Sequence, residues 1–456
     1  YPKLEIEGGA GVRPHKNSIN NYCYPENPEA GIDLFLEKLV QETEKEHEDI
    51  LEQADETDAM FGELYSWYLR NPEYRSRVQK LVQSAFAGKL KDIISQSVAK
   101  ALYGEVSPYS ATRLERFAAC AFAHFLQYGM KLTERVEYEF KPMDMGNVMH
   151  EALESFAEEV RKRGMKWTEL TEQERNEIAD RCLDNIVADY GNTVLKSSAR
   201  NEYMIERTRR ILRRTVWALQ KQLEQGEFQP EGFEVTFGGG RIDRVDIMED
   251  QNKVYVKVID YKTGNTSFDL VYLYHGLQLQ LMIYLDGALR VEQKKYPDKE
   301  IIPAGVFYYN IKDPMIQEKI DADVEAVSAG LMKELKMNGL AQADPELVYR
   351  MDSSLGSIPV AFNKDGSFRK NSSVADRTQF AVLGRYVRTK IEKIRSSILE
   401  GDAEVSPYEL GKKNACTYCP YMTVCGFDRR LSGYEFRRLK NFSDEELWKA
   451  FDREAE

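Results

Sequence analysis

The sequence is poor in cysteine and histidine and has no long apolar run. Six cysteines among 456 residues are too sparse for a disulfide framework. No stretch approaches the roughly 20 apolar residues that a membrane helix needs, and the first residues lack the apolar core of a signal peptide. These absences exclude a small secreted scaffold and a membrane span, so we expect a reducing cytoplasm. Because the chain begins at Tyr1 rather than at methionine, we also expect a piece of a longer protein.

Positive charge is in deficit as well, with 63 Lys and Arg against 75 Asp and Glu and a net charge of −12. Such a chain has no overall attraction for nucleic acid, so a nucleic-acid partner requires a locally basic surface. The densest basic stretch is the predicted helix over 205–221. Two interpretations stay open, a solvated helix face and a surface that contacts DNA phosphates. For the second, the candidate residues are Arg207, Arg210 and Arg214.

Hydrophobic periodicity predicts a helical first part followed by a mixed α/β part. Residues 1–27 are loop-like, and helices are expected within 28–104, the last of them over 81–104. Ser107 and Pro108 mark a boundary between a helical segment, 1–105, and a second domain, 106–456. In that domain we expect helices over 110–129, 145–163, 170–226, 275–295, 376–400 and 444–451, strands within 232–264 and 301–311, and a hairpin over 360–370.

An acidic pair and a lysine carry the clearest chemical signal. Alternation along 253–262 predicts a strand that is apolar on one face until Asp260 and Lys262. Asp243 lies on the preceding strand, and a hairpin-like connection would bring it beside Asp260. Two carboxylates suit Mg²⁺ or Mn²⁺, and a neighbouring lysine can stabilise charge on a phosphate. An isolated Asp-x-Lys is more commonly a salt bridge, but the preceding Gly-x-Ile-Asp-Arg-Val-Asp favours the metal site.

Three further polar residues lie on predicted helices. His150 is a candidate metal ligand because neutral imidazole commonly binds metals. Gln280 and Tyr284 are four residues apart and share a helix face, where they could hold a phosphate or an attacking water. Each of them, taken alone, is equally compatible with an ordinary amphipathic helix.

A cysteine cluster lies near the end of the chain, where Cys416, Cys419 and Cys425 fall within ten residues. Cys120, almost three hundred residues earlier, is a candidate fourth ligand. An iron–sulfur cluster takes four thiolates, whereas zinc sites usually offer paired Cys-x₂-Cys arms or histidines. Spacing alone leaves both metals open.

Together these segments resemble one family. SPYSATRLERFAACAFAHFLQYG, GNVMHEAL, GRIDRVD, VIDYKTG, LQLQLMIY, AGVFYY and CTYCPYMTVCGFD follow in the order of the AddB subunit of bacterial AddAB helicase–nucleases. The resemblance covers roughly residues 105–430. It implies an α/β fold of the RecB-like PD-(D/E)XK nuclease type, in which helices flank a mixed central sheet, and a [4Fe–4S] cluster that staples the ends of the domain.

The resemblance also implies roles for individual residues. His150, Asp243, Asp260 and the backbone carbonyl of Tyr261 would bind Mg²⁺ or Mn²⁺, and Lys262 would be the catalytic lysine. Gln280 and Tyr284 match the Gln-x₃-Tyr helix motif of the family. The cluster ligands would be Cys120, Cys416, Cys419 and Cys425. Ala121 departs from the proline more common after the first cysteine, but it is not a ligand.

The activity implied is a metal-dependent DNA exonuclease that processes double-strand ends for recombinational repair and cuts the strand ending 5′. Its substrate would be single-stranded DNA from unwound duplex ends, and its partner an AddA-like motor and nuclease subunit in a heterodimer in the bacterial cytoplasm, without a membrane. No G-x₄-G-K-[ST] loop for ATP occurs, and residues 1–105 would be the tail of a helicase-like region. The rivals are a stand-alone iron–sulfur nuclease of the CRISPR-adaptation type and a catalytically silent DNA-binding scaffold.

Overall fold

The computed structural model describes residues 28–44, 56–85, 93–104, 110–133, 142–189, 198–238, 240–316, 323–431 and 433–455. The chain divides into two compact units, Tyr1–Asp92 with Met422–Phe436 and Ile93–Tyr421 with Arg437–Glu456. The loop expected over 1–27 and the boundary at Ser107 and Pro108 lie outside the described residues. The division of the sequence at residue 105 therefore stays a prediction.

The first unit is almost entirely helical within residues 28–44 and 56–85. Along one helix, Ile32, Phe35 and Leu39 recur at helical spacing and are buried. They pack against Phe61, Leu64, Tyr68 and Val78. The phenol of Tyr68 donates a hydrogen bond to the carbonyl of Pro28 at 2.6 Å. The helices of this unit are α2 (Pro28–Glu44), α3 (Glu56–Arg70), α4 (Pro72–Ala85) and α16 (Met422–Cys425).

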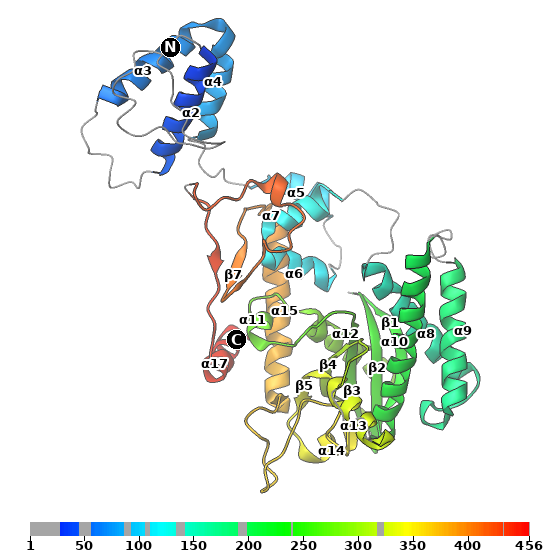
Figure 1. The fold of residues 1–456 in the computed structure, drawn as a ribbon. Helices are drawn as coiled ribbons and strands as arrows, with labels where there is room; N and C mark the ends of the chain where they lie inside the picture. Colours follow the sequence, from blue (N-terminus) through cyan, green and yellow to red (C-terminus); the bar gives the residue numbers. More distant parts are fainter. Residues whose placement is uncertain are drawn as a thin grey trace. The chain divides into compact units, whose positions relative to one another are not determined.

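The second unit is built on a six-stranded sheet (Figure 1), and the sheet is mixed, as the family resemblance implies. The strands lie in chain order, and β1–β2, β2–β3 and β4–β5 pair antiparallel, whereas β3–β4 and β5–β6 pair parallel. A helical crossover joins β3 to β4, because parallel neighbours need a long connection. The strands are β1 (Gln229–Phe237), β2 (Gly240–Asp250), β3 (Lys253–Lys262), β4 (Glu300–Asn310), β5 (Asn338–Gln342) and β6 (Val374–Ala375).

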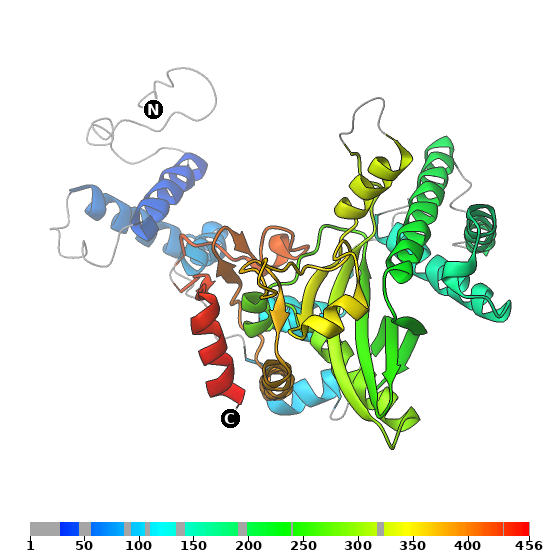
Figure 2. The same cartoon turned by 90° about the horizontal axis from the view of Figure 1, so that it is seen from below.

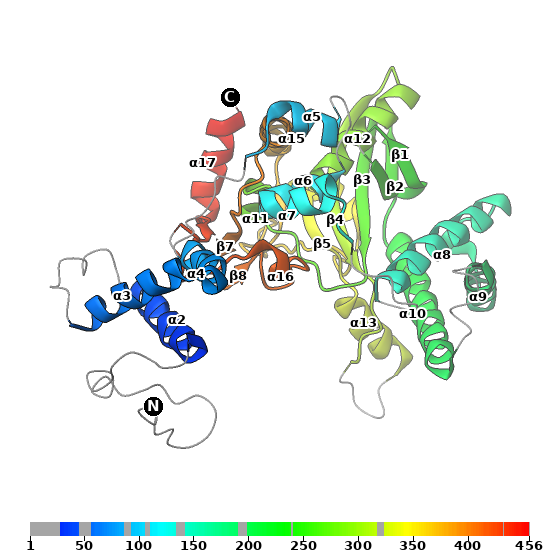
Figure 3. The same ribbon diagram turned by 90° about the horizontal axis from the view of Figure 1, so that it is seen from above.

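Helices cover both faces of this sheet (Figures 2 and 3). The alternation in β3 sets the two layers: Val254, Val256 and Val258 enter one core, and Ile259 and Tyr261 enter the other. The core on the valine face also includes side chains of α5 (Gln96–Tyr103), α6 (Ala111–Ala119), α12 (Gln280–Lys295), α15 (Arg377–Glu400) and α17 (Asp444–Ala455). The core on the opposite face includes side chains of α8 (Pro142–Lys162), η3 (Trp167–Glu169), α9 (Glu172–Asp189), α10 (Ala199–Glu224) and α14 (Pro345–Met351).

Several expected elements begin or end where the sequence places them. Ser110 caps α6 by accepting the N–H of Arg113, and Gly401, with a φ of +91°, ends α15 directly after the helix expected over 376–400. Phe362 and Phe368 form an antiparallel bridge within the hairpin expected over 360–370. The remaining elements are α7 (Ala121–His124), η2 (Phe125–Gly129), α11 (Leu270–Tyr274), α13 (Val324–Glu334), β7 (Tyr408–Leu410), β8 (Lys413–Asn414) and β9 (Arg437–Arg438). Among the described helices, none is both long and apolar enough to cross a bilayer.

Three expected helices are wrong in their extent. The helix over 81–104 is interrupted, because Ile93 bridges Asp402 and Ser95 begins α5. The helix over 110–129 breaks at Cys120, which is extended with a φ of −165°.

The helix over 275–295 begins only at Gln280. The side chain of Gln278 instead holds the preceding loop by donating to the carbonyl of Ser267. In all three cases, a contact with a distant or looped segment replaces the hydrogen bonds of a continuous helix.

Candidate functional site

The two predicted aspartates meet at the point where β2 and β3 separate. The last ladder pair at this end joins Arg244 to Ile259, so Asp243 and Asp260 occupy the next position along the two strands. One Asp243 carboxylate oxygen, Oδ2, accepts the backbone N–H of Tyr261 at 2.7 Å. Both carboxylates are buried, at 8% and 1% exposure. The hairpin between β2 and β3 therefore places two acids side by side in a desolvated position.

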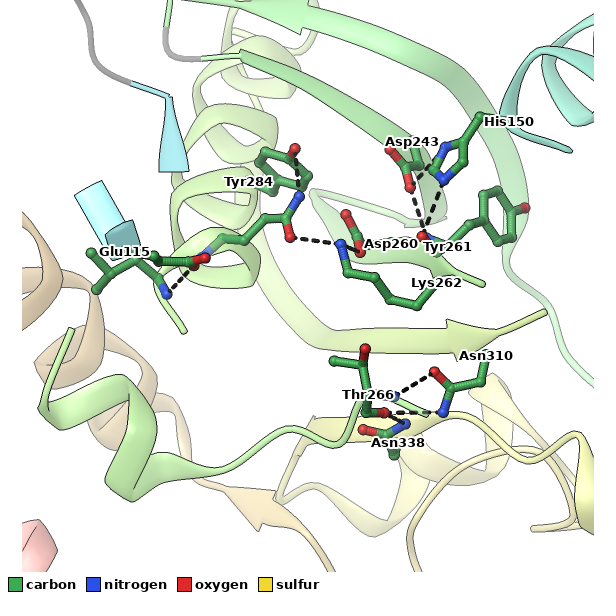
Figure 4. A network of polar contacts seen from close by, with 12 residues as sticks. Glu115, His150, Asp243, Asp260, Tyr261, Lys262, Thr266, Tyr284, Asn310 and Asn338 are labelled. Atoms are coloured by element: carbon green, nitrogen blue, oxygen red, sulfur yellow. Dashed lines mark hydrogen bonds and ion pairs between the residues drawn. The ribbon is translucent and has the colours of Figure 1, made fainter. Parts of the chain in front are cut away.

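His150 reaches the same place from α8 (Figure 4). Its Nε2 atom lies 3.2 Å from the carbonyl oxygen of Tyr261, and its Nδ1 atom lies 3.4 Å from Asp243. Helix α8 packs its apolar side, including Val148 and Met149, into the core, which leaves the imidazole at the edge. The structure thus brings the residues predicted as metal ligands together, and their role as ligands stays a prediction.

Glu234 of β1 is a member of this group that sequence reasoning missed. Its carboxylate lies 3.6 Å from Nδ1 of His150, and its side chain is 6% exposed. Ligand atoms of His150, Glu234 and Asp243 all lie within 4.8 Å of one another. Glu234 has a φ of +49°, a left-handed conformation that a non-glycine residue rarely adopts in a strand. Only the β1–β2 register, which pairs Val235 with Ile242, could have identified it.

The buried carboxylates of this site are unfavourable as charged groups unless a cation or a proton neutralises them. Burial, followed by the neighbouring Asp260, raises the pKa of Asp243 to about 7. Burial also raises the pKa of Asp260, although the ammonium of Lys262 opposes this shift. Burial lowers the pKa of His150, but the Glu234 and Asp243 carboxylates outweigh it and raise the value overall. Carboxylate and carbonyl oxygens with one imidazole are donors that suit Mg²⁺ or Mn²⁺, so the residues fit a divalent cation.

These shifts give a stability that depends on pH when divalent metal is removed. The pKa of Asp243 is raised from 3.8 to about 7, and that of His150 is raised from 6.5. The folded chain therefore keeps protons that the unfolded chain releases. The protons bound at Asp243 and His150 stabilise the folded chain fully below the unfolded pKa of Asp243. This contribution to the free energy of unfolding is lost as the pH rises through about 7.

We therefore expect Mg²⁺ to raise the melting temperature more at about pH 8 than at about pH 5, because the cation competes with these protons. Thermal melts of the EDTA-treated chain with and without Mg²⁺ measure the difference. Asp243→Asn is the control and should flatten the pH dependence. An equal Mg²⁺ effect at both pH values would contradict this account of the site.

Lys262 connects the acidic pair to helix α12. Its Nζ atom lies 2.6 Å from Oδ2 of Asp260 and donates a hydrogen bond to Oε1 of Gln280 at 2.8 Å. The amide of Gln280 in turn donates to the phenol of Tyr284 at 2.9 Å. Figure 4 shows Lys262 lying between Asp260 and the first turn of α12. The ammonium is thus held beside the carboxylates while its side chain stays 27% exposed.

The opposite face of β2 carries a second charged group. Arg244 makes two hydrogen bonds with Asp246, at 2.6 and 2.9 Å, and Lys257 lies 2.9 Å from the same carboxylate. The guanidinium of Arg244 lies over the rings of Trp167 and Phe233. All three charged residues are buried. This group belongs to the packing between the sheet and η3 and not to the acidic pair.

The basic residues of α10 are more neutralised than the sequence indicates. Arg210 lies 2.6 Å from Asp313, and Arg214 lies 3.9 Å from the same carboxylate. Arg214 also lies over the ring of Trp217. Arg207 is exposed. Contact with DNA therefore stays a prediction for these arginines, and Asp313 competes with phosphate for two of them.

Part of the cysteine cluster lies in one small core of the second unit. Cys120 and Cys419 pack together with Ala123, Leu126 and Tyr421. Burial raises the pKa of the Cys120 thiol, while backbone N–H groups of the Cys120 turn and of Ser406 oppose the shift. Cys416 is half-buried, and its N–H is bound by Asn414. Cys425 ends α16 in the other unit, where its sulfur accepts the N–H of Phe427.

Comparison with known proteins identifies relatives for most of the chain. The family model described as the PD-(D/E)XK nuclease superfamily matches residues 108–426. A protein of Lachnoclostridium phytofermentans, named as a subunit of an ATP-dependent helicase/deoxyribonuclease, is 41% identical over 425 residues, covering 88% of this chain and 36% of that protein.

Two proteins of the same name show a similar match. That of Thermoanaerobacter sp. (strain X514) is 33% identical over 88% of this chain and 37% of its own length. That of Alkaliphilus metalliredigens is 34% identical over 87% of this chain and 37% of its own length. The chain thus spans 36% to 37% of the length of these relatives.

Proposed function

The chain belongs to the PD-(D/E)XK nuclease superfamily, and we propose that it is a metal-dependent deoxyribonuclease. The observation that carries this proposal is the buried pair Asp243 and Asp260, with His150 on one side and Lys262 on the other. The test is cleavage of end-labelled single-stranded DNA by the purified protein, with Mg²⁺ or with EDTA. Cleavage that requires Mg²⁺ supports an enzyme, whereas DNA binding without cleavage would indicate a silent scaffold.

The residues that would hold the cation are His150, Asp243, Asp260 and the carbonyl of Tyr261, with Glu234 alongside. A bound Mg²⁺ or Mn²⁺ would acidify a water and polarise the scissile phosphate. The 2.7 Å bond from the Tyr261 N–H orients the Asp243 carboxylate. This N–H belongs to the peptide that links Asp260 to Tyr261. The hydrogen bond therefore holds the Asp243 carboxylate close to Asp260 and to the backbone of Tyr261.

Lys262 would act on the phosphate. Its ammonium is partly exposed and is fixed by Asp260 and Gln280, so it can stabilise the negative charge that develops as the phosphodiester is attacked. Tyr284 orients the Gln280 amide by accepting its N–H, which turns Oε1 toward the lysine. Gln280 and Tyr284 therefore position the ammonium of Lys262 that would face the phosphate.

The wider role that we propose follows the printed name of the relatives, which describes them as parts of a helicase/deoxyribonuclease. This chain would act with an AddA-like motor and nuclease subunit on single strands unwound from duplex ends in the bacterial cytoplasm, cutting the strand ending 5′ during recombinational repair. Copurification with a tagged partner subunit, together with polarity assays on 5′- and 3′-labelled duplex ends, tests this role. Full activity without a motor subunit would favour a stand-alone nuclease.

For DNA contact we expect Arg207 to matter more than its neighbours on α10, because it is exposed and Arg210 and Arg214 already contact Asp313. Arg207→Ala should reduce the salt dependence of single-stranded DNA binding by about 0.7 in the log–log slope, the value for one phosphate contact. Arg213→Ala is the matched control, since Arg213 lies on the same helix and is held by Asp180 of α9. Equal slopes for the wild type and Arg207→Ala would remove this residue from the DNA surface.

We also propose that Cys120, Cys416, Cys419 and Cys425 bind a [4Fe–4S] cluster. Four cysteines match the ligand number of such a cluster, which tolerates one distant ligand. The packing of Cys120 beside Cys419, and the N–H groups around the Cys120 sulfur, support a thiolate site at this position. The cluster would join segments almost three hundred residues apart, which is a structural contribution.

Cys419→Ser should therefore remove the iron and lower the melting temperature. A structural metal site contributes directly to folding, and each kcal/mol shifts the melting temperature by about 2–4 °C in domains of 150–250 residues, so a loss of a few kcal/mol should lower it by up to roughly 10 °C. Iron and sulfide analysis and thermal melts under anaerobic conditions measure both effects. Cys182→Ser, a buried cysteine in α9, should keep its iron. Unchanged iron and stability in Cys419→Ser would refute the assignment.

A further inference from the structure

Helix α12 begins without a cap from its own sequence. Leu279, at the N-cap position, has no side chain that can accept a hydrogen bond. The backbone N–H groups of Leu279 and Gln280 instead donate to Oε1 of Glu115, at 2.7 and 2.9 Å. Glu115 lies on α6, far earlier in the chain, and Figure 4 shows its carboxylate at the start of α12. A distant carboxylate therefore satisfies donors that a helix start leaves open.

The Glu115 carboxyl is buried against the start of α12 and has little contact with solvent. Burial raises its pKa to about 7, and the two N–H groups of α12 are the strongest opposing influence. The N-terminal end of a helix carries partial positive charge, which favours a carboxylate there. Lys262 and Asp260 also influence this carboxyl. Glu115 is thus electrostatically connected to the site as well as hydrogen-bonded to α12.

The contact leads directly to the lysine. Gln280, whose N–H is bound by Glu115, is the first residue of α12, and its side-chain oxygen accepts from Lys262 at 2.8 Å. Lys262 in turn lies 2.6 Å from Asp260. A shift of the first turn of α12 would move the Gln280 amide and leave the lysine held on one side only.

We infer that Glu115 is a positioning residue for catalysis, which fixes the first turn of α12 so that Gln280 holds Lys262 toward the phosphate. This inference rests on the proposed nuclease activity. Helix α6, which carries Glu115, ends at Cys120, one of the predicted cluster ligands. The same helix therefore connects the proposed cluster site with the support of Lys262.

A positioning role and a merely structural role differ in what they predict. If Glu115 only stabilised α12, Glu115→Ala would lower the melting temperature and leave the turnover of folded protein unchanged. If it acts through Gln280, turnover falls while the KM for DNA stays constant, because ground-state binding of DNA is not affected. The losses of turnover caused by Glu115→Ala and by Gln280→Ala should then not be additive, because both residues act in one network.

The experiment compares Glu115→Ala, Glu115→Gln, Gln280→Ala and the double variant Glu115→Ala/Gln280→Ala in cleavage of single-stranded DNA. We expect Glu115→Ala to lower kcat by about 10- to 100-fold, the range for a residue that orients a reactive group. Glu115→Gln keeps the oxygen that accepts both N–H groups and should retain most activity. The double variant should lose no more than Gln280→Ala alone. Additive losses would overturn the inference.

A second measurement is independent of DNA cleavage. Competitive labelling of lysine amines, read by mass spectrometry, should show faster modification of Lys262 in Glu115→Ala and Gln280→Ala but not in Glu115→Gln. Asp376→Ala is the control, because Asp376 caps α15 through the N–H of Gln379 at 2.8 Å and does not contact the site. Unchanged labelling of Lys262 in Glu115→Ala would overturn the inference, even if the wild type proved inactive and the proposed function failed.

Discussion

Asp260→Asn should abolish metal-dependent DNA cleavage, lowering the rate by on the order of 10³-fold or more. The substitution keeps the shape of the side chain and removes the charge that would bind the cation and pair with Lys262. Losing a single electrostatic contact to a transition state costs about 10²–10³-fold, and here a predicted cation ligand is lost as well. Single-turnover cleavage of labelled DNA at saturating Mg²⁺ measures the effect.

The same variant should not be less stable than the wild type without metal. Asp260 is 1% exposed, and burial raises its pKa, so its charge is unfavourable in the metal-free fold. Asp250→Asn is the matched control, because Asp250 lies at the far end of β2 in an ion pair with Arg350. It should cleave like the wild type. Cleavage by Asp260→Asn at the wild-type rate would remove the acidic pair from the mechanism.

Asp246→Ala should cause the largest loss of stability, about 3–5 kcal/mol. Asp246 is fully buried between Arg244 and Lys257. Burial already lowers the pKa of Lys257, so without its partner this residue can release its proton. Arg244 cannot do so, because guanidinium stays charged in proteins. A buried cation without a counter-charge then remains beside the stacked rings of Trp167 and Phe233.

Urea unfolding of the metal-free chain would measure this loss as a lower midpoint. Asp250→Ala on the same strand removes a partly exposed ion pair and should cost at most about 1 kcal/mol. Asp246→Asn should fall between the two, since the amide still accepts a hydrogen bond from Arg244. A loss for Asp246→Ala no larger than that of Asp250→Ala would show that this group does not hold the sheet to its helices.

These two predictions separate functions that one short motif combines. In the segment Gly240–Asp246, Asp243 faces the site, whereas Arg244 and Asp246 face the opposite side of the sheet, where Arg244 lies over Trp167 and Phe233. The motif therefore contains both a carboxylate of the proposed site and the buried charged group behind it. The ring of Tyr261 lies on the Arg244 side, and its backbone contacts Asp243 and His150. Disturbing the core group should thus also disturb the site.

The amino-acid sequence alone predicted the central strands, the pairing of the two aspartates and the family of this protein. Alternation in 253–262 predicted which side chains of β3 share a face, because a strand has a period of two. The hairpin-like connection expected before it is confirmed by the antiparallel pairing of β2 and β3, which brings Asp243 beside Asp260. Residue chemistry pointed to a divalent cation, and the order of motifs pointed to the nuclease superfamily. The first three inferences depend on local spacing or on residue type, and the last depends on the resemblance of the motifs to a known family.

Only the tertiary structure decided the rest. Glu234 joins His150 through the β1–β2 register, and Glu115 caps α12 across 164 positions of sequence. The helix that seemed continuous breaks at Cys120, and Asp313 neutralises arginines about a hundred residues away. No local period encodes such contacts, because they form only after distant segments pack together. The residues proposed to react are therefore visible in the sequence, whereas the residues that hold them become visible only in the fold.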